Sequence, residues 1–251
     1  MFYNYVKQTH NKGIIDSIAF NNKRYKYDSS GYEGASEYIA SNLLSQTNIK
    51  DYVSYTITIF KNNGEERLGC YFDDFVGEKT LFSPLNFIYF NNIFRRNLKE
   101  CLKLLDKVVP GAGIFYTQML EFDRFILNTD RYFHNMCMLE NEDNSFSLAP
   151  LYDNSYSFLL DAFMSKRPKT HCSSDEFRAS LSSKPFYDDF DRQVNTAIDL
   201  YGSQLKIKKN LSISDEVKET VAGFYGDEIV MWIERFIEEQ KDRYGEYLIL
   251  D

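Results

Sequence analysis

Short runs of strand-favouring residues separated by polar turns predict two hairpins in the first 80 residues, and apolar and polar residues alternate strongly in "YTITIF". The segments "GIIDSIAF" and "KRYKYD" flank the pair Asn21–Asn22, a sequence typical of a tight hairpin turn. A second hairpin is predicted from "YVSYTITIF" and "RLGCYFDDF", which the polar turn "KNNGEE" connects. Both hairpins are rich in the β-branched and aromatic residues that favour strands.

Between the two hairpins the period changes from that of a strand to that of a helix. The segment "GYEGASEYIASNLLSQT" places Ala40, Leu43 and Leu44 on one helical face, together with Glu37. The predicted order is therefore β-β-α-β-β, a small sheet that carries one helix.

After about residue 78 the apolar residues recur at helical spacing, in 85–109, 114–128 and most of 186–250. A short hairpin with the turn "ENEDNS" is predicted within 136–153, and a long loop over 156–183. The segment "SISDE" offers an N-terminal cap for a late helix. We therefore predict an α+β, bilobal chain, with a β-rich N-lobe at 1–78 and a helical C-lobe at 79–251.

Composition narrows the class of protein. Apolar residues make up 43% and aromatic residues 16%, enough for a large core. A net charge of -8 argues against a general nucleic-acid-binding protein, which needs a basic face. The four cysteines and three histidines are scattered, so we expect no zinc site and a reduced, cytoplasmic protein. The polar start and the lack of long apolar runs predict no leader and no membrane contact, with leaderless secretion as the alternative.

Three oxygen-bearing residues suggest chemistry. Asp130 and Asn135 lie in "LNTDRYFHNMCML", and Asp153 ends the apolar run of "FSLAPLYDNS". Taken alone, each residue is more often a turn former or a helix cap. Asp130 and Asn135 nevertheless have the D-x-x-x-x-N spacing of a protein-kinase catalytic loop, and hard oxygen ligands suit Mg²⁺.

Two charged residues upstream match the needs of phosphoryl transfer. Lys26 lies in the strand "RYKYD" and Glu37 in the following helix, the order of the lysine–glutamate pair of protein kinases. Lys23 and Arg24 are rivals of Lys26, and Glu33 is a rival of Glu37. The continuous apolar face of "EYIASNLL" favours Glu37.

Together, "YKYDSSGYEGASEYIASNLL", "FILNTDRYFHNMCML" and "LAPLYDNS" resemble the HipA-like kinase family, relatives of the bacterial Ser/Thr kinase toxins; "KPFYDDFDRQV" adds weaker support. In that family the loop usually reads N-x-D-(R/A)-H-x-x-N, and the metal-binding Asp follows "AP-x-Y". The resemblance implies a bilobal protein-kinase-like fold. By position it makes Asp130 the catalytic Asp, Asn135 and Asp153 the Mg²⁺ ligands, Lys26 the ligand of the ATP α/β-phosphates, and Glu37 the residue that orients Lys26.

The strand end "CYFDDF" resembles the stretch that leads into the hinge, so backbone groups near Phe72 and Asp74 are expected to hold adenine. The sequence departs from the family at two points. Tyr132 stands where the family usually has His, with His134 two residues later. Before Lys26 there is one glycine, Gly13, and no glycine-rich loop, which leaves the phosphate lid undefined.

The resemblance implies an ATP-dependent kinase that phosphorylates a protein Ser or Thr hydroxyl with Mg²⁺. The alternatives are a small-molecule or lipid-headgroup kinase and a nucleotide-binding pseudokinase regulator. The intact Lys, Glu, Asp, Asn, Asp set argues against the pseudokinase, since loss of one member is its usual mark. The implied partners are a protein substrate and a cognate regulator or antitoxin protein, as in toxin–antitoxin pairs.

Overall fold

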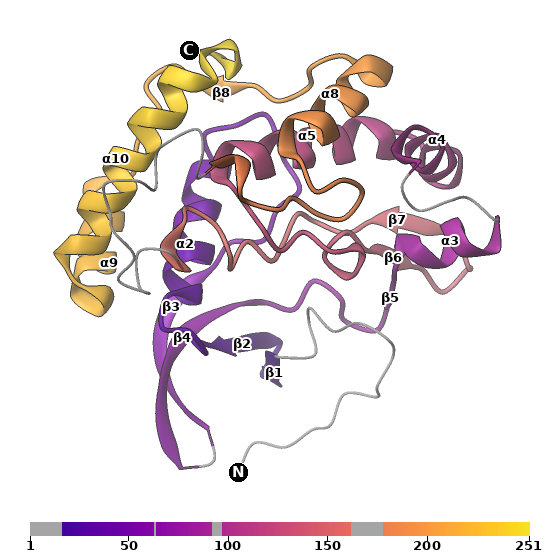
Figure 1. Cartoon of the computed structure of the whole chain (residues 1–251). Coiled ribbons are helices and arrows are strands. Elements are labelled where there is room, and N and C mark those ends of the chain that lie inside the picture. The colour runs from indigo at the N-terminus through magenta and orange to yellow at the C-terminus, as the bar shows by residue number, and fades with distance from the viewer. Residues whose placement is uncertain (1–16, 63, 92–96, 162–177) are drawn as a thin grey trace.

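The computed structural model describes residues 17–62, 64–91, 97–161 and 178–251. Its first sheet is antiparallel, with the strand order β1-β2-β4-β3 (Figure 1). Asn21 and Asn22 both have positive φ angles, 49° and 59°, as a two-residue hairpin turn requires. Both predicted hairpins are confirmed. The strands are β1 (Ser17–Phe20), β2 (Lys23–Tyr27), β3 (Thr56–Asn62) and β4 (Glu65–Asp73).

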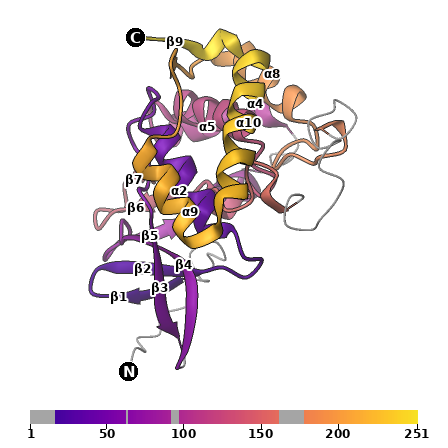
Figure 2. The same ribbon diagram turned by 90° about the vertical axis from the view of Figure 1, so that its left-hand side faces the viewer.

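Helix α2 (Glu33–Leu44) lies between this sheet and the C-terminal helices α9 (Asp215–Tyr225) and α10 (Asp227–Arg243) (Figures 1 and 2). It confirms the predicted helix, and the predicted apolar face is buried. Because neighbours cover it on several sides, even its polar residues Ser36 and Glu37 are buried. Those buried polar groups need partners from other segments.

A second sheet has the order β5-β6-β7 and lies above the first in Figure 1. Strands β6 (Met138–Glu140) and β7 (Phe146–Leu148) form the predicted hairpin. Strand β5 (Thr80–Phe82) was not predicted, because three residues are too few to show a period. An apolar cluster that includes Tyr55, Phe72, Phe75 and Tyr152 joins the two sheets.

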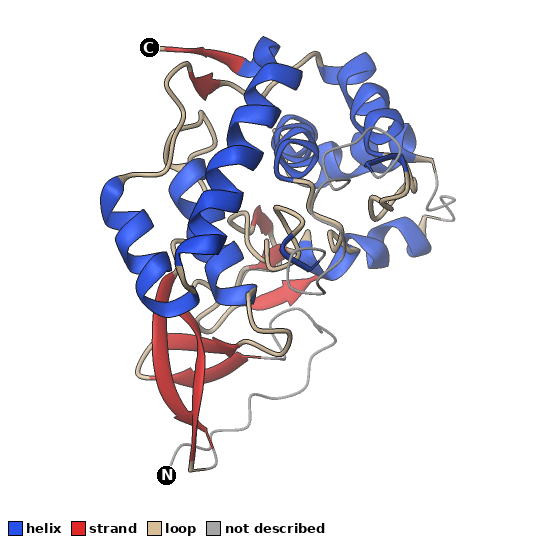
Figure 3. Ribbon diagram, turned by 60° about the vertical axis from the view of Figure 1, so that its left-hand side comes forward, coloured by secondary structure: helices blue, strands red, loops and turns tan. Residues whose placement is uncertain are grey.

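The remaining helices form the larger part of the molecule (Figure 3). The central helix α5 is buried along most of its length and packs against α4 and α8. The predicted cap at "SISDE" is confirmed, since the Ser214 side chain accepts a hydrogen bond from the Val217 N–H at 3.3 Å. The bounds are α3 (Pro84–Phe90), α4 (Leu98–Val108), α5 (Ala112–Ile126) and α8 (Phe190–Tyr201).

The prediction of helix up to residue 250 is wrong at its end. Helix α10 ends at Arg243, where a 3-10 turn (Gly245–Tyr247) leads into β9 (Leu248–Leu250). Gly245 disfavours helix, and buried Tyr247 accepts a hydrogen bond from Arg124. Strand β9 then pairs with β8 (Ile207–Lys208).

Two further expectations concern the lobes and the long loop. The lobe boundary near residue 78 stays a prediction; it falls between the end of β4 and the start of β5. The centre of the predicted loop 156–183 lies outside the described residues. No described helix is long and apolar enough to cross a membrane.

Candidate active site

The ammonium group of Lys26 is the meeting point of three segments. Its Nζ lies 2.7 Å from Glu37 Oε1 in α2, 2.8 Å from Asp153 Oδ1 and 2.9 Å from Ser155 Oγ. Glu37 is fully buried, whereas the Lys26 side chain is 13% exposed. The structure thus brings together Lys26 and Glu37, predicted at the ATP phosphates, with Asp153, predicted as a Mg²⁺ ligand, and it adds Ser155.

The rival residues lie elsewhere. Lys23 pairs with exposed Asp73 at 3.1 Å, on the surface of the sheet. Arg24 Nε lies 2.9 Å from an Asp74 carboxylate oxygen. The Glu33 carboxylate accepts hydrogen bonds from backbone N–H groups before the first turn of α2, a position that stabilises the helix end. None of these three contacts the Lys26 site.

The segment 153–155 is fastened to α2. The Asn154 N–H donates to Glu37 Oε2 at 2.7 Å, and the Ser36 hydroxyl donates to the Asn154 carbonyl at 2.6 Å. Asp153 has φ 60°, a left-handed conformation that few residues except Gly adopt without cost. Its N–H donates to the Tyr55 hydroxyl at 3.2 Å. These contacts hold the Asp153 carboxylate toward Lys26 in a strained backbone, a feature that clusters at functional sites.

The loop 130–135 is organised around the backbone of Asp130. The Asp130 N–H donates to Asn128 Oδ1 at 3.1 Å, and the Asp130 carbonyl accepts from Asn135 Nδ2 at 3.0 Å. Asn135 Oδ1 is buried and has no hydrogen-bond partner among the described residues. The Asp130 carboxylate likewise has no described donor, so both side-chain oxygens are available to a ligand. Tyr132 is 41% exposed and stacks on His134.

A buried arginine joins this loop to the segment 152–154. Arg131 is fully buried, and its guanidinium donates twice to the Asp123 carboxylate, at 2.8 and 2.9 Å. Its other donors go to the Asn135 carbonyl at 3.1 Å, the Tyr152 carbonyl at 2.5 Å and Asn154 Oδ1 at 2.8 Å. Arg131 therefore fixes the position of Asn135 relative to Asp153.

Four residues of the site were not predicted from the sequence in these roles: Asp123, Arg131, Asn154 and Ser155. Asp123 carried a signal, because it interrupts the apolar spacing of a helix, and a buried charge needs a partner. Asn154 and Ser155 offered only their position directly after Asp153.

Charges and burial shift the pKa values of the three carboxyl groups of the site in different directions. Burial raises the pKa of Lys26's partner Glu37, with the Lys26 charge opposing this shift. Burial also disfavours the charged form of Asp153, yet the Lys26 charge and hydrogen bond hold its pKa below the ordinary value. Burial and the Asp153 charge raise the pKa of Asp130 to about 6, against the lowering charges of Arg131, Lys26 and Lys184. A carboxylate with a pKa near neutrality suits a general base.

The donor set fits Mg²⁺. Asp153 supplies a carboxylate, and Asn135 supplies a buried amide oxygen that lacks a partner. Within the described ranges, no three His, Cys, Asp or Glu side chains form a cluster that could hold a metal by themselves. Mg²⁺ does not need one, because it is commonly held by one or two protein oxygens, with waters and phosphates completing its shell.

The residues expected near adenine differ from each other. The Phe72 side chain is buried in the cluster between the sheets, 5.0 Å from the Tyr55 ring. Asp74 is used within the protein: its N–H donates to the Asn22 carbonyl at 2.8 Å, and its carboxylate accepts from the Val76 N–H at 3.0 Å. The carbonyl of Asp74 accepts no hydrogen bond from the described residues. The adenine contact stays a prediction.

Comparison with solved structures shows the fold. The crystal structure of a Helicobacter pylori proinflammatory kinase, CtkA, is similar to this chain with a TM-score of 0.61. The match covers 92% of this chain and 88% of the other, at 16% sequence identity. No protein-family model matches the sequence, and no curated protein does. The chain therefore has a kinase-like fold, which confirms the predicted fold class.

Proposed function

We propose that this protein is an ATP-dependent kinase of the HipA-like type, which phosphorylates a Ser or Thr hydroxyl of a protein with Mg²⁺. The observation that carries the proposal is the position of Lys26 Nζ between Glu37 and Asp153, at 2.7 and 2.8 Å. In protein kinases the lysine of this pair binds ATP phosphates and the Asp binds the metal. The sequence contains a residue of each required type, in the order Lys26, Glu37, Asp130, Asn135 and Asp153.

Each residue has a defined task in the proposed reaction. Lys26 binds the α/β-phosphates, and Glu37 holds Lys26 in place. Asn135 and Asp153 would hold Mg²⁺, which would neutralise charge on the β- and γ-phosphates. Asp130 orients the acceptor hydroxyl and takes its proton.

In the transfer itself, a bond forms between the acceptor oxygen and the γ-phosphorus. The bond from the γ-phosphorus to the β,γ-bridging oxygen breaks, ADP leaves, and the hydroxyl proton passes to Asp130. Most of the rate gain comes from positioning and charge neutralisation, because the protein makes no covalent bond to the substrate.

The test compares Asp130→Ala with Asp153→Ala. Asp130→Ala should keep the affinity for MgATP within a few-fold, because Lys26, Asn135 and Asp153 still hold the phosphates. Its phosphoryl transfer should fall by roughly 100-fold or more, the scale for loss of a positioned acid–base group. Asp153→Ala should lose both, since it removes a metal ligand and a partner of Lys26. The measurements are calorimetric titration with MgATP and label transfer from γ-labelled ATP to the protein itself or to a host lysate.

Asp143→Ala, in the exposed turn between β6 and β7, is the control and should behave like the wild type. A wild type that binds MgATP but transfers no label would favour the pseudokinase alternative. If the wild type binds no nucleotide, the similarity of this protein to kinases is limited to the fold.

A further inference from the structure

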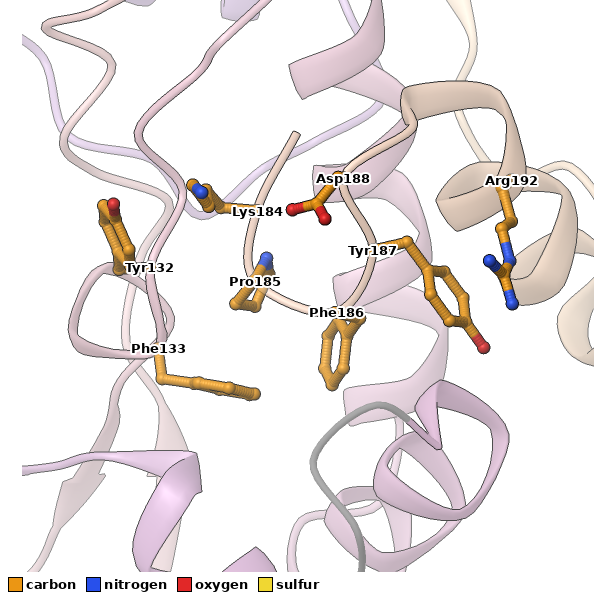
Figure 4. Close-up of a pocket in the computed structure, with 8 residues that line it drawn as sticks. All are labelled: Tyr132, Phe133, Lys184, Pro185, Phe186, Tyr187, Asp188 and Arg192. Atoms are coloured by element: carbon orange, nitrogen blue, oxygen red, sulfur yellow. The ribbon is translucent and has the colours of Figure 1, made fainter. Parts of the chain in front are cut away.

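A cavity of about 380 Å³ opens beside the loop that carries Asp130 (Figure 4). Its floor is apolar: Phe133 and Phe186 are buried, and their rings meet edge to face at 5.1 Å. Tyr132, two residues after Asp130, forms one side together with Lys184. The far side carries Tyr187, Asp188 and Arg192. The wall of the cavity therefore begins two residues along the chain from Asp130, which is proposed to take the proton of the acceptor hydroxyl.

The loop itself offers no arginine or lysine to a phosphate. Arg131 is the only Arg or Lys between residues 130 and 135, and its five donors are used on protein oxygens. Lys26 is held between Glu37 and Asp153 at the other end of the site. Phosphoryl transfer spreads negative charge over the moving group, and a cation at that point stabilises the transition state.

Lys184 is a lysine of the cavity whose charge reaches the Asp130 carboxyl, since it acts to lower the pKa of that group. Its Nζ is 5.6 Å from the centre of the Tyr132 ring, and its side chain is partly exposed at the cavity. Among the residues that the structure describes, no carboxylate forms an ion pair with Lys184. A lysine ammonium on a flexible stem is a good phosphate ligand, because it can move to meet the charge.

The backbone that carries Lys184 is fixed. The buried side chain of Gln193 in α8 donates from Nε2 to the Lys184 carbonyl at 2.7 Å. Gln193 Oε1 accepts from the N–H groups of Phe186 at 3.0 Å and Tyr187 at 3.3 Å. The loop 184–187 is thus held on α8 by three hydrogen bonds to one side chain, while the ammonium group is left to a ligand.

We propose that Lys184 is a further catalytic residue, whose ammonium contacts the γ-phosphoryl group as it moves toward an acceptor bound at the cavity. The inference rests on the proposed function. Lys26 then holds the phosphates that remain on ADP, and Lys184 stabilises the group that leaves it. The apolar floor beside the exposed Tyr132 and the partly exposed Lys184 suits a segment of protein chain as the acceptor.

The experiment compares Lys184→Met, which keeps the bulk of the side chain, with Lys184→Arg, which keeps the charge. Label transfer from γ-labelled MgATP is measured on the protein itself and on dephosphorylated casein. We expect Lys184→Met to lower kcat by roughly tenfold or more, with the KM for ATP nearly unchanged, as for loss of one transition-state contact. Lys184→Arg should recover a large part of the rate. Lys103→Met, at an exposed position of α4, should match the wild type.

A binding measurement tests the role of Lys184 without an acceptor protein. MgADP with aluminium fluoride imitates the transferring phosphoryl group, whereas MgADP alone does not. Lys184→Met should lose about tenfold in affinity for the fluoride complex and keep its affinity for MgADP, because only the former carries the charge that Lys184 meets.

The possible outcomes separate the two proposals. Equal affinity of wild type and Lys184→Met for the fluoride complex would overturn the role of Lys184 while leaving the kinase proposal in place. Equal losses for MgADP with and without fluoride would also overturn it, because they indicate general damage to the site. A wild type that binds neither nucleotide complex would overturn the kinase proposal, and the role of Lys184 with it.

Discussion

Two cations bind alternate residues of the segment 152–155, and they do so in different ways. Arg131 is fully buried and uses its rigid fork on Asp123 and on oxygens of Tyr152 and Asn154. Lys26 is partly exposed and uses its three donors on Glu37, Asp153 and Ser155. The guanidinium matches its acceptors in a fixed plane, whereas an ammonium on a flexible stem can exchange one oxygen for another.

This difference indicates that the Arg131 contacts stabilise the fold, whereas the Lys26 contacts are available to a ligand. Around Arg131 every donor is used and no solvent reaches the group, so nothing is left for a ligand. Around Lys26 the acceptors face a partly open site, where phosphate oxygens can take the place of Asp153 while a metal ion takes the carboxylate. Substitution of Arg131 should therefore cost folding, and substitution of Lys26 should cost nucleotide binding.

The largest effect is expected for Arg131→Met. It leaves the Asp123 carboxylate buried without its cation, and removing one partner of a buried ion pair costs about 3–5 kcal/mol. The free energy of unfolding is measured in urea. Lys99→Met is the matched control, because Lys99 pairs with Asp199 on the surface, where such pairs contribute roughly 1 kcal/mol or less. If Arg131→Met were as stable as Lys99→Met, the Arg131 contacts would not be what stabilises the fold around the site.

Lys26→Ala tests whether the Lys26 contacts serve nucleotide binding. Because Lys26 is proposed to bind the α/β-phosphates, its loss should weaken MgATP binding by roughly tenfold or more, the scale of a charge-assisted contact. Lys23→Ala removes a lysine three residues away whose partner is the exposed Asp73, and it should titrate like the wild type. Calorimetry with MgATP gives both affinities. A Lys23→Ala variant that lost binding while Lys26→Ala kept it would mean that the phosphates bind on the outer surface of the sheet.

The two networks also differ in how far the sequence revealed them. Lys26, Glu37 and Asp153 could be selected because phosphoryl transfer constrains their types and order, and the elements that carry them have clear periods. Arg131 and Asp123 could not be paired in this way, since their contact depends on how α5 packs against the loop. Ser155 could not be predicted either, because its contact with Lys26 depends on the turn of the chain at Asp153. Strand β5 and the pairing of β9 with β8 were missed because segments of two or three residues leave no pattern.

The smallest expected effect concerns Asp28, a carboxylate that forms no ion pair with any residue in the described part of the chain. It accepts hydrogen bonds from the Gly34 N–H at 2.7 Å and from the Tyr225 hydroxyl at 2.8 Å. Burial raises the pKa of Asp28 to about 6, although both hydrogen bonds lower it, whereas Lys26 keeps the pKa of Asp153 below its ordinary value. We therefore expect these two partly buried carboxylates to affect stability in opposite directions as the pH changes.

For Asp28 the folded-state pKa of about 6 lies above the value of about 3.9 in an unfolded chain. The folded protein therefore binds this proton more tightly, and the stability that the proton contributes is lost as the pH rises through 6. A pKa difference of about 2 corresponds to roughly 2–3 kcal/mol, and solvent screening reduces the effect because Asp28 is partly exposed. The free energy of unfolding of the wild type relative to Asp28→Asn should therefore fall by about 1 kcal/mol between pH 4 and pH 7.5. Urea unfolding across this range measures the difference.

Tyr225→Phe removes a hydrogen bond that lowers the pKa of Asp28, so it should move the loss of stability to higher pH. A difference between wild type and Asp28→Asn that stays constant with pH would show that Asp28 is ionised throughout, and that burial without a cation is not enough to raise its pKa.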